Sequence, residues 1–205
     1  MRAQTQQLRR DCRNHPFVRG IEDGSLPAEV FCRWVVQDWR YLLTYVQVLE
    51  SLAELAPLPG PAQRWRSLAE FTRSDELALH RAYAVRFGLT DGDLDGATDA
   101  PATRAYTQFL CDQAERSYGF GVAALVPCGV GYVTLAADLS KGALPPEPRY
   151  ADWIVTYADP DFAQAVQWME RQLDELDEDD EELLMIYRKG AEHELAFWQQ
   201  LWAGW

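Results

Sequence analysis

The sequence predicts an all-α protein in which a single domain spans residues 1–205. Apolar residues recur at spacings of three and four along most of the chain, which is the helical period, and the alternating pattern of surface β-strands is sustained nowhere. Prolines and glycines cluster between these periodic segments, where they end helices. The length suits one sizeable hydrophobic core, so these observations together predict one bundle of about seven helices.

The expected helices follow one another along the chain. A long helix runs from Pro27 to Ala56, where a proline-rich segment ends it, and a second helix covers about Ala62 to Phe87. The acidic segment 90–101 contains two Asp-Gly pairs and is expected to be a loop. Further helices are expected at residues 104–116, 120–139 with a break or kink near Pro127, 150–157 after a proline-rich connection over 141–148, from Pro160 onward, and 180–202.

The charge balance narrows the classes of partner. The chain has 32 acidic and 19 basic residues and a formal net charge of -13. Binding to a polyanion needs a basic surface, so neither nucleic acid nor an anionic membrane is an expected partner. The basic segment 1–15 lacks the apolar stretch of a secretory signal, which predicts a cytoplasmic protein. Residues 120–137 carry no charge, but internal proline and glycine and the lack of flanking basic clusters favour a buried core helix over a membrane span.

Two carboxylates lie on otherwise apolar helix faces. Asp38 shares a face with aromatic residues such as Trp34 and Tyr41, so it needs a donor, whether an arginine, a tyrosine hydroxyl or the amino group of a ligand. Glu194 shares a face with Tyr187 and Trp198. In apolar surroundings the pKa of Glu194 rises towards the range useful for acid–base catalysis, whereas a buried arginine beside it would lower that pKa.

The four cysteines are far apart and form no Cys-x-x-Cys pair, so free thiols are expected rather than disulfides or a zinc site. Cys128 differs from Cys12, Cys32 and Cys111 because it directly follows Pro127 on the uncharged helix. A thiol in that position is either inert packing or a reactive group. A helix broken at Pro127 would expose backbone groups and a helix N-terminus, both of which favour the thiolate. The other three cysteines are expected to be structural.

The histidines do not form the pattern of a helical di-iron site. That pattern is Glu-x-x-His, but the residues three positions before His15, His80 and His193 are not glutamates. Glu76 and His80 are four residues apart, a spacing that indicates a helix-surface pair or structural packing rather than a metal site. No metal is therefore expected.

Several segments, in order and at sensible spacing, resemble the TenA/thiaminase II family, whose members have the haem-oxygenase-like helical fold without binding haem. The segments are HPFVRGIEDGSLP at 15–27, QDWRYL at 37–42, ELALHRAY at 76–83, AYTQFL at 105–110, ALVPCGVGY at 124–132, YADWIVTYADPDF at 150–162 and ELAFWQQLW at 194–202. No single segment is diagnostic, but together they cover nearly the whole chain.

The resemblance implies an activity and a site. It implies Cys128 as nucleophile, Glu194 as acid/base, and a pyrimidine pocket lined by Asp38, Tyr41, Tyr106, Tyr132 and Tyr157. The implied reaction is hydrolysis at the exocyclic methylene of an aminopyrimidine or of thiamin, giving hydroxymethylpyrimidine for thiamin salvage, with no metal or organic cofactor. A homotetramer is also implied, and the aromatic C-terminus with Trp198, Trp202 and Trp205 suits a subunit contact.

The chain departs from the family pattern at two places. Trp39 stands where a tyrosine is more usual, and Val130-Gly131 replaces bulkier residues after the cysteine, which predicts a roomier pocket. Two other functions remain open at this point. One is a metal-dependent di-iron oxidase of the same fold, which iron analysis would detect, and the other is a non-catalytic pyrimidine-binding or regulatory protein, although the acidic chain lacks a basic helix-turn-helix.

Overall fold

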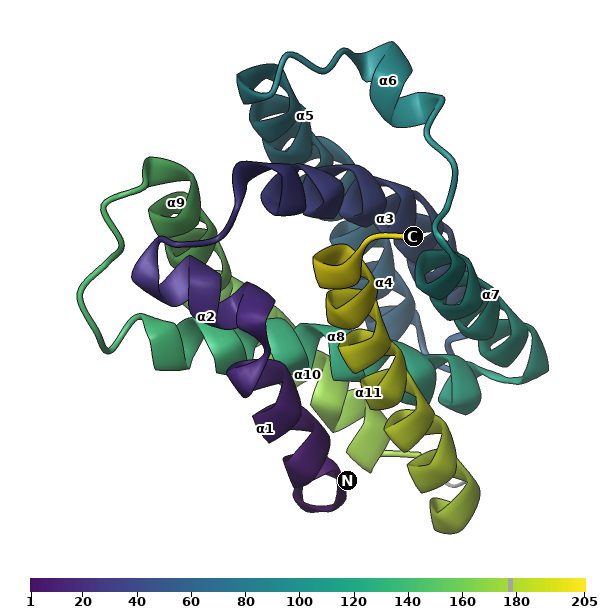
Figure 1. The fold of residues 1–205 in the computed structure, drawn as a ribbon. Coiled ribbons are helices and arrows are strands. Elements are labelled where there is room, and N and C mark those ends of the chain that lie inside the picture. Colours follow the sequence, from purple (N-terminus) through teal and green to yellow (C-terminus); the bar gives the residue numbers. More distant parts are fainter. Residues whose placement is uncertain (177–178) are drawn as a thin grey trace.

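A computed structural model describes residues 1–176 and 179–205, and the regular elements in these ranges are helical (Figure 1). In chain order they are η1 (a 3₁₀ turn, Arg2–Thr5), α1 (Gln6–Asn14), α2 (Pro16–Asp23), α3 (Ala28–Leu55), α4 (Pro59–Phe71), η2 (a π-helical segment, Thr72–Glu76), α5 (Leu77–Arg86), α6 (Asp91–Asp95), α7 (Pro101–Arg116), α8 (Tyr118–Leu139), α9 (Pro148–Tyr157), α10 (Pro160–Asp174) and α11 (Asp180–Ala203). The all-α prediction is confirmed. Asp177 and Glu178, which lie in the acidic run before α11, fall outside the described residues.

Short helices that the apolar pattern did not predict raise the number above the expected seven or so. The N-terminal segment forms η1, α1 and α2. His15 caps the start of α2, because its ring Nδ1 accepts a hydrogen bond from the Phe17 N–H at 3.2 Å, and Pro16 occupies the first helical position. The expected loop at 90–101 contains α6, because Thr90 and Asp93 form a reciprocal capping box. These helices depend on end caps, which hydrophobic periodicity does not detect.

The helix expected over 62–87 is present but starts earlier and contains an irregular turn. Pro59 lies in the first turn of α4, where a proline is well tolerated, so it begins a helix instead of only ending the previous one. The π-helical segment η2 separates α4 from α5 and places Glu76 at its last position. Such π segments inside helices are frequent at functional sites.

The central helix α8 continues through Pro127, so the expected break is wrong. Two glycines allow its neighbours to approach closely at this point. A Cβ on Gly190 of α11 would lie 2.9 Å from the Pro127 ring, and a Cβ on Gly129 would lie 2.8 Å from Val166 of α10. Packing against helices on several sides holds the backbone in helical conformation despite the missing N–H of the proline.

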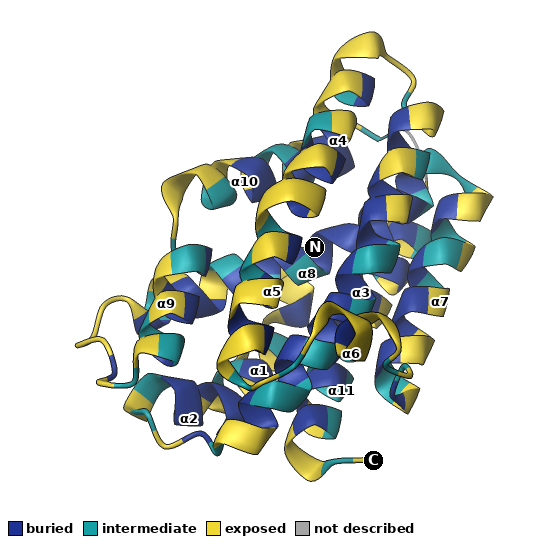
Figure 2. Cartoon of the chain, turned by 90° about the horizontal axis from the view of Figure 1, so that it is seen from above, coloured by how far each residue is buried: buried dark blue, intermediate teal, exposed yellow. Residues whose placement is uncertain are grey.

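Exposed residues lie on the outer faces of the helices, and buried residues face inward (Figure 2). Within the described part of the chain, α8 alone has the length and hydropathy of a membrane-spanning helix, but 67% of its most apolar window is buried inside the protein. This agrees with the core helix that the sequence predicts. Trp198 is also completely buried, so it is wrong to assign it to a subunit contact, whereas Trp202 and Trp205 are exposed.

Candidate active site

A small cavity lies where α3, α7, α8 and α11 meet. Its volume is about 10 Å³, which is room for about one water molecule. The lining residues are Asp38, Tyr41, Tyr106, Cys128, Tyr132, Glu194 and Phe197. The structure thus brings together all but one of the residues proposed from the sequence. Tyr157 does not line the cavity but packs against Tyr132, with ring centroids 4.7 Å apart. Phe197 was not anticipated, although it lies three residues after Glu194 on the same helix.

Asp38 is fixed by two side-chain donors. Its Oδ2 lies 2.8 Å from Nε2 of His80, and its Oδ1 accepts a hydrogen bond from the Tyr132 hydroxyl at 3.2 Å. The Tyr132 hydroxyl in turn accepts from Nε1 of Trp34 at 3.2 Å. The sequence left the partner of Asp38 open between an arginine, a tyrosine hydroxyl and a ligand, and the structure supplies a tyrosine and a histidine. Each carboxylate oxygen keeps acceptor capacity for a further donor at the cavity.

His80 is completely buried, so its expected place on a helix surface is wrong, whereas structural packing is confirmed. Its Nδ1 lies 2.9 Å from the Glu76 carbonyl oxygen, which leaves Nε2 directed at Asp38. Burial by itself lowers the pKa of His80, but the hydrogen bond to Asp38 and the charge of that carboxylate outweigh burial and raise it. His80 therefore holds Asp38 in one orientation.

Glu194 on α11 is 6% exposed and faces Cys128. Burial raises its pKa to about 7, and the nearby Asp38 charge acts in the same direction, while the Tyr106 hydroxyl and the Cys128 thiol lower it. No arginine contributes to this shift, so the upward direction expected for an apolar setting is confirmed. A carboxyl group with this pKa can both accept and donate a proton near neutral pH.

The Cys128 thiol is held in its protonated form. Burial raises the pKa of Cys128 well above its usual value, and the charge of Glu194 raises it further, whereas the Tyr41 hydroxyl lowers it. The expectation that Pro127 exposes a helix N-terminus favouring the thiolate is therefore wrong, because α8 is continuous there. A nucleophile at this position needs a base to remove its proton, and Glu194 is the carboxylate beside it.

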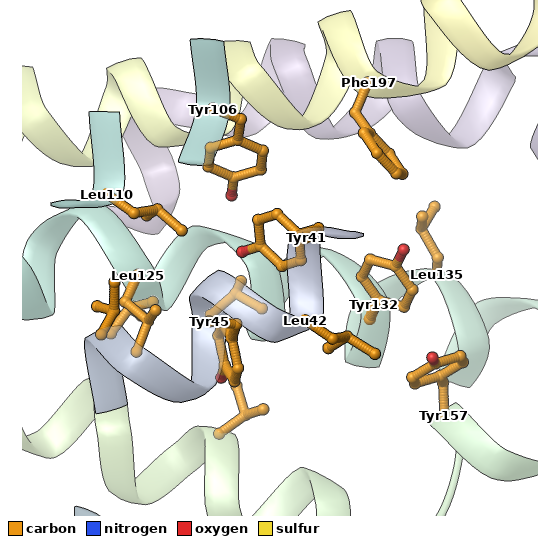
Figure 3. Packing of buried hydrophobic residues seen from close by; sticks show 14 of the residues in the cluster. Tyr41, Leu42, Tyr45, Tyr106, Leu110, Leu125, Tyr132, Leu135, Tyr157 and Phe197 are labelled. Carbon is orange, nitrogen blue, oxygen red and sulfur yellow. The ribbon is translucent and has the colours of Figure 1, made fainter. Parts of the chain in front are cut away.

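Four buried tyrosine hydroxyls lack partners with hydrogen-bond geometry among the described residues, and two of them lie at the cavity. These two belong to Tyr41 of α3 and Tyr106 of α7, whose ring centroids are 4.9 Å apart (Figure 3). An unsatisfied buried hydroxyl costs about 1–3 kcal/mol, so such groups are rare in folded proteins without a reason. Both line the cavity, where the polar edge of a bound molecule can satisfy them.

Glu76 is a functional candidate that the sequence reasoning missed. It lies next to the cavity at the end of η2, where the Tyr157 hydroxyl donates to its Oε1 at 3.4 Å. Burial raises the pKa of Glu76 to about 7, opposed by His80 and supported by Asp38. The four-residue spacing of Glu76 and His80 was the available signal, but it was interpreted as a helix-surface pair or structural packing and not as part of a site.

The described residues contain no group of three or more His, Cys, Asp or Glu side chains that could hold a metal ion. Taken together, the fold and the cavity define a helical protein with a thiol–carboxyl pair beside a second carboxylate and two tyrosine hydroxyls.

Comparison with known proteins gives the family. Residues 2–204 match the model of the TENA/THI-4/PQQC family, and the chain belongs to this family. It is 35% identical to the aminopyrimidine aminohydrolase of Halalkalibacterium halodurans over 169 residues, which cover 79% of this chain and 73% of the relative. It is 29% identical to the enzyme of the same name from Helicobacter pylori over 196 residues, which cover 92% and 90% of the two chains.

Solved structures show the same fold. A TenA homologue from P. horikoshii OT3 superimposes with a TM-score of 0.93 at 26% identity, covering 100% of this chain and 97% of that one. A domain of unknown function with a heme oxygenase-like fold from Shewanella denitrificans OS217 has a TM-score of 0.70 at 13% identity, covering 97% and 88%. The haem-oxygenase-like fold expected from the sequence is confirmed.

Proposed function

We propose that the protein is an aminopyrimidine aminohydrolase of the thiaminase II type, which acts in thiamin salvage with Cys128 as nucleophile and Glu194 as acid/base. The observation that carries the proposal is the pairing of this thiol and this carboxyl group in one buried cavity. The relatives named aminopyrimidine aminohydrolase support the reaction class. The substrates would be 4-amino-5-aminomethyl-2-methylpyrimidine (aminomethylpyrimidine) and thiamin.

Recognition of the pyrimidine would fall to the polar groups around the cavity. Asp38, held by His80 and Tyr132, can accept a hydrogen bond from the exocyclic amino group and so orient the ring. The hydroxyls of Tyr41 and Tyr106 can bond to the ring nitrogens, and Phe197 offers an apolar surface. A pyrimidine is larger than the cavity, so these side chains move apart when it binds.

The reaction would proceed by addition and elimination. Glu194 takes the thiol proton and passes it to a ring nitrogen while the Cys128 sulfur bonds to the ring carbon beside the substituted position. The electron pair pushed back through the ring expels the group on the exocyclic methylene, which leaves with the bonding pair. Water adds to that methylene and loses a proton to the departed amine or to solvent. The sulfur then leaves with its bonding pair while Glu194 returns the ring-nitrogen proton to it, which restores the aromatic ring and the thiol. Covalent catalysis of this kind divides one difficult substitution into easier steps.

The shifted pKa values suit this scheme. The raised pKa of Cys128 keeps its proton until a substrate arrives, and a Glu194 carboxyl with a pKa of about 7 is ionised in a large fraction of molecules at neutral pH. In molecules in which Glu194 is ionised, the Cys128–Glu194 pair therefore holds one transferable proton, on the thiol.

The location and the assembly belong to the same proposal. The four free cysteines, which are usual in a reducing compartment, support a cytoplasmic location. A homotetramer is supported by the family resemblance and by the exposed Trp202 and Trp205 at the end of α11. Analytical ultracentrifugation checks the assembly, and a monomer at micromolar concentration would contradict it.

The decisive experiment measures hydroxymethylpyrimidine release from aminomethylpyrimidine and, separately, from thiamin. We expect Cys128→Ser to lower kcat by about a thousandfold or more with both substrates, because serine is a far weaker nucleophile in this setting. Cys111→Ser is the matched control, since Cys111 is also partly buried but lies outside the cavity. Unchanged turnover in Cys128→Ser would refute the nucleophile, and no turnover by the wild type would refute the reaction.

A further inference from the structure

A second and much larger cavity opens beside the catalytic one. It has a volume of about 510 Å³ and forms a groove between α1, the second half of α8 and α11. We call it the basic groove, and its lining residues are Arg2, Gln6, Leu8, Arg9, Arg10, Cys12, Arg13, Pro127, Gly131, Val133, Thr134, Leu135, Ala137, Asp138, Lys141, Ala191, Glu194 and Trp198. This volume lies in the range of small-molecule sites.

The charge of the basic groove is opposite to that of the rest of the protein. Five of the 19 lysines and arginines line it, but only two of the 32 acidic residues do. The chain as a whole carries a net charge of -13, which repels anions at long range. A local concentration of cations opposes this repulsion and favours the binding of an anion there.

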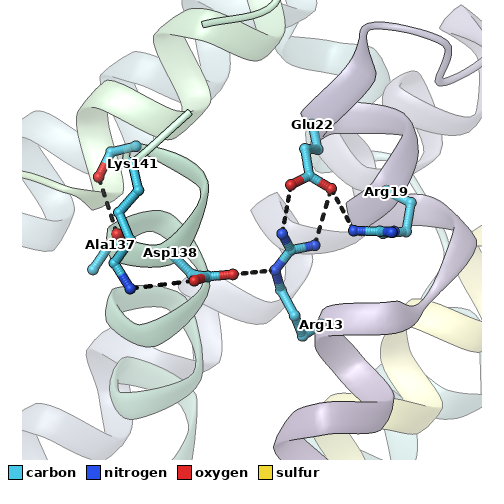
Figure 4. A network of polar contacts seen from close by, with 7 residues as sticks. Arg13, Arg19, Glu22, Ala137, Asp138 and Lys141 are labelled. Carbon is cyan, nitrogen blue, oxygen red and sulfur yellow. Dashed lines mark hydrogen bonds and ion pairs between the residues drawn. The ribbon is translucent and has the colours of Figure 1, made fainter. Parts of the chain in front are cut away.

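Some of these cations are neutralised by neighbouring carboxylates. Arg2 forms an ion pair with Glu170, and Arg13 lies between Glu22 and Asp138 (Figure 4). Lys141 also contacts Asp138, at 3.3 Å. These pairs shape one side of the groove without leaving a full positive charge there.

Two arginines have no carboxylate partner among the described residues. Arg9 donates to the Thr5 hydroxyl at 2.6 Å and to the Arg2 carbonyl oxygen, which are both neutral acceptors. Arg10, one position later on α1, is exposed. Guanidinium groups bind phosphate oxygens through two parallel hydrogen bonds, so this pair is suited to an anionic group with several oxygens.

The inner end of the basic groove meets the catalytic cavity. Glu194 lines both spaces, so the groove leads directly to the proposed acid/base. Gly131 stands at this junction, where a Cβ would lie 3.5 Å from Oε2 of Glu194. The small residue at position 131 therefore keeps the boundary between groove and carboxylate free of a side chain. A substituent leaving from the exocyclic methylene would find its exit here.

From these observations we infer that the basic groove binds a phosphate monoester carried by the departing group, so that phosphorylated substrates are preferred over unphosphorylated ones. The inference rests on the proposed function, because that function places the exocyclic methylene of the substrate beside Glu194. A phosphate monoester carries a charge of about -2 at neutral pH and offers three acceptor oxygens. Arg9 and Arg10 would hold it, while the groove walls of α8 and α11 contact the rest of the departing group.

The test compares thiamin monophosphate with thiamin and aminomethylpyrimidine as substrates. We expect Arg9→Gln/Arg10→Gln to raise KM for thiamin monophosphate by about tenfold or more, because two charge-assisted contacts are lost. KM for aminomethylpyrimidine, which has no phosphate, should stay within about twofold, since the pyrimidine pocket is unchanged. Arg64→Gln/Arg66→Gln is the matched control, because these arginines are exposed on α4, far from the groove lining.

Binding without turnover separates this inference from the proposed function. Calorimetry with Cys128→Ser should show that thiamin monophosphate binds more tightly than thiamin, and that 0.5 M salt or added inorganic phosphate reduces the difference, as expected for a partly exposed anion site. The inference is overturned if the arginine pair changes neither KM nor affinity for the phosphate ester while aminomethylpyrimidine is hydrolysed. It is also overturned if Arg9→Gln/Arg10→Gln dissociates an oligomer instead, which would make the groove a subunit contact.

Discussion

The catalytic cavity and the basic groove share Glu194 but differ in volume and in the charge of their lining residues. The cavity holds about 10 Å³ and is lined by aromatic rings, hydroxyls, a thiol and carboxyl groups, whereas the groove holds about 510 Å³ and is lined by five cationic side chains. In the cavity, burial raises the pKa values of Cys128 and Glu194. In the groove, solvent screens the charges.

The difference suggests a division of labour within one binding site. The narrow catalytic cavity favours the chemical step, because proton transfer and nucleophilic attack depend on shifted pKa values and fixed orientation. The open basic groove favours selection of the departing group, because its charge can attract groups of different sizes. Glu194 and Gly131 stand at the boundary between the two. Variants at and around this boundary therefore test whether the cavity and the groove have separate roles.

The largest effect is expected for Glu194→Gln. Loss of the proton-transfer group should lower kcat by roughly 10²–10⁴-fold. In the wild type, kcat/KM should rise with pH through a pKa of about 7, because the free enzyme needs ionised Glu194 to take the thiol proton. This limb should disappear in the variant. A pH–rate profile of both proteins is the measurement, and an unchanged limb would show that another group, such as Glu76, controls it.

The same variant should stabilise the fold at alkaline pH. The folded pKa of Glu194 is about 7 against an ordinary value of 4.5, so the folded state holds a proton that the unfolded state has lost. Stability therefore falls as pH rises from about 4.5 to about 7, by a total of about 3 kcal/mol. Glu194→Gln removes this penalty. Urea unfolding should show the variant gaining stability at pH 8 but little at pH 4.5, and equal gains at both would contradict burial as the cause.

A second test concerns the support of the cavity by His80. Asp38→Asn removes the charge that raises the pKa of His80, so burial should then lower that pKa below its ordinary value. The chain has three histidines, so NMR titration can follow the His80 ring by comparison with His80→Gln. We also expect kcat/KM for aminomethylpyrimidine to fall by about a hundredfold, as expected for loss of an orienting contact. An unchanged His80 titration would show that Asp38 does not govern it.

A smaller effect is expected on the reactivity of the thiol. Because the pKa of Cys128 is well above its usual value, iodoacetamide should modify this residue slowly at pH 8.5, which mass spectrometry of the tryptic peptides can follow. Glu194→Gln removes a charge that raises this pKa, so modification should become several-fold faster, with about tenfold for each unit of pKa. Rapid alkylation of the wild type would indicate a thiolate and contradict the shared proton.

The smallest effect is expected for Gly131→Ala, which tests the boundary itself. The added methyl would lie 3.5 Å from Oε2 of Glu194, an ordinary contact that narrows the junction without a clash. We expect kcat/KM for thiamin to fall by about threefold while that for aminomethylpyrimidine, with its small departing group, is nearly unchanged. The fold should gain about 0.5–1 kcal/mol, because alanine replaces glycine inside a helix. An equal loss with both substrates would place Gly131 outside the exit.

Much of the site followed from the sequence, for identifiable reasons. Asp38 and Glu194 were found because a carboxylate on an apolar helix face is conspicuous, and both line the cavity. Cys128 was singled out through its neighbour Pro127 and the family resemblance, but the predicted state of the thiol was wrong. For Glu76 and His80 the sequence left a helix-surface pair and structural packing open, because a four-residue spacing does not say which way a helix faces.

The long helices, the single apolar core and the residue types that carry the chemistry are evident in the sequence. Helical period and apolar content are local properties, so they can be derived from neighbouring residues. The remaining features are visible only in the tertiary structure. In it, α8 stays continuous at Pro127, His80 contacts Asp38 of another helix, and basic residues of α1 line the same groove as Glu194 of α11. These features depend on contacts between residues far apart in the chain, and a pKa depends on the burial that such contacts create.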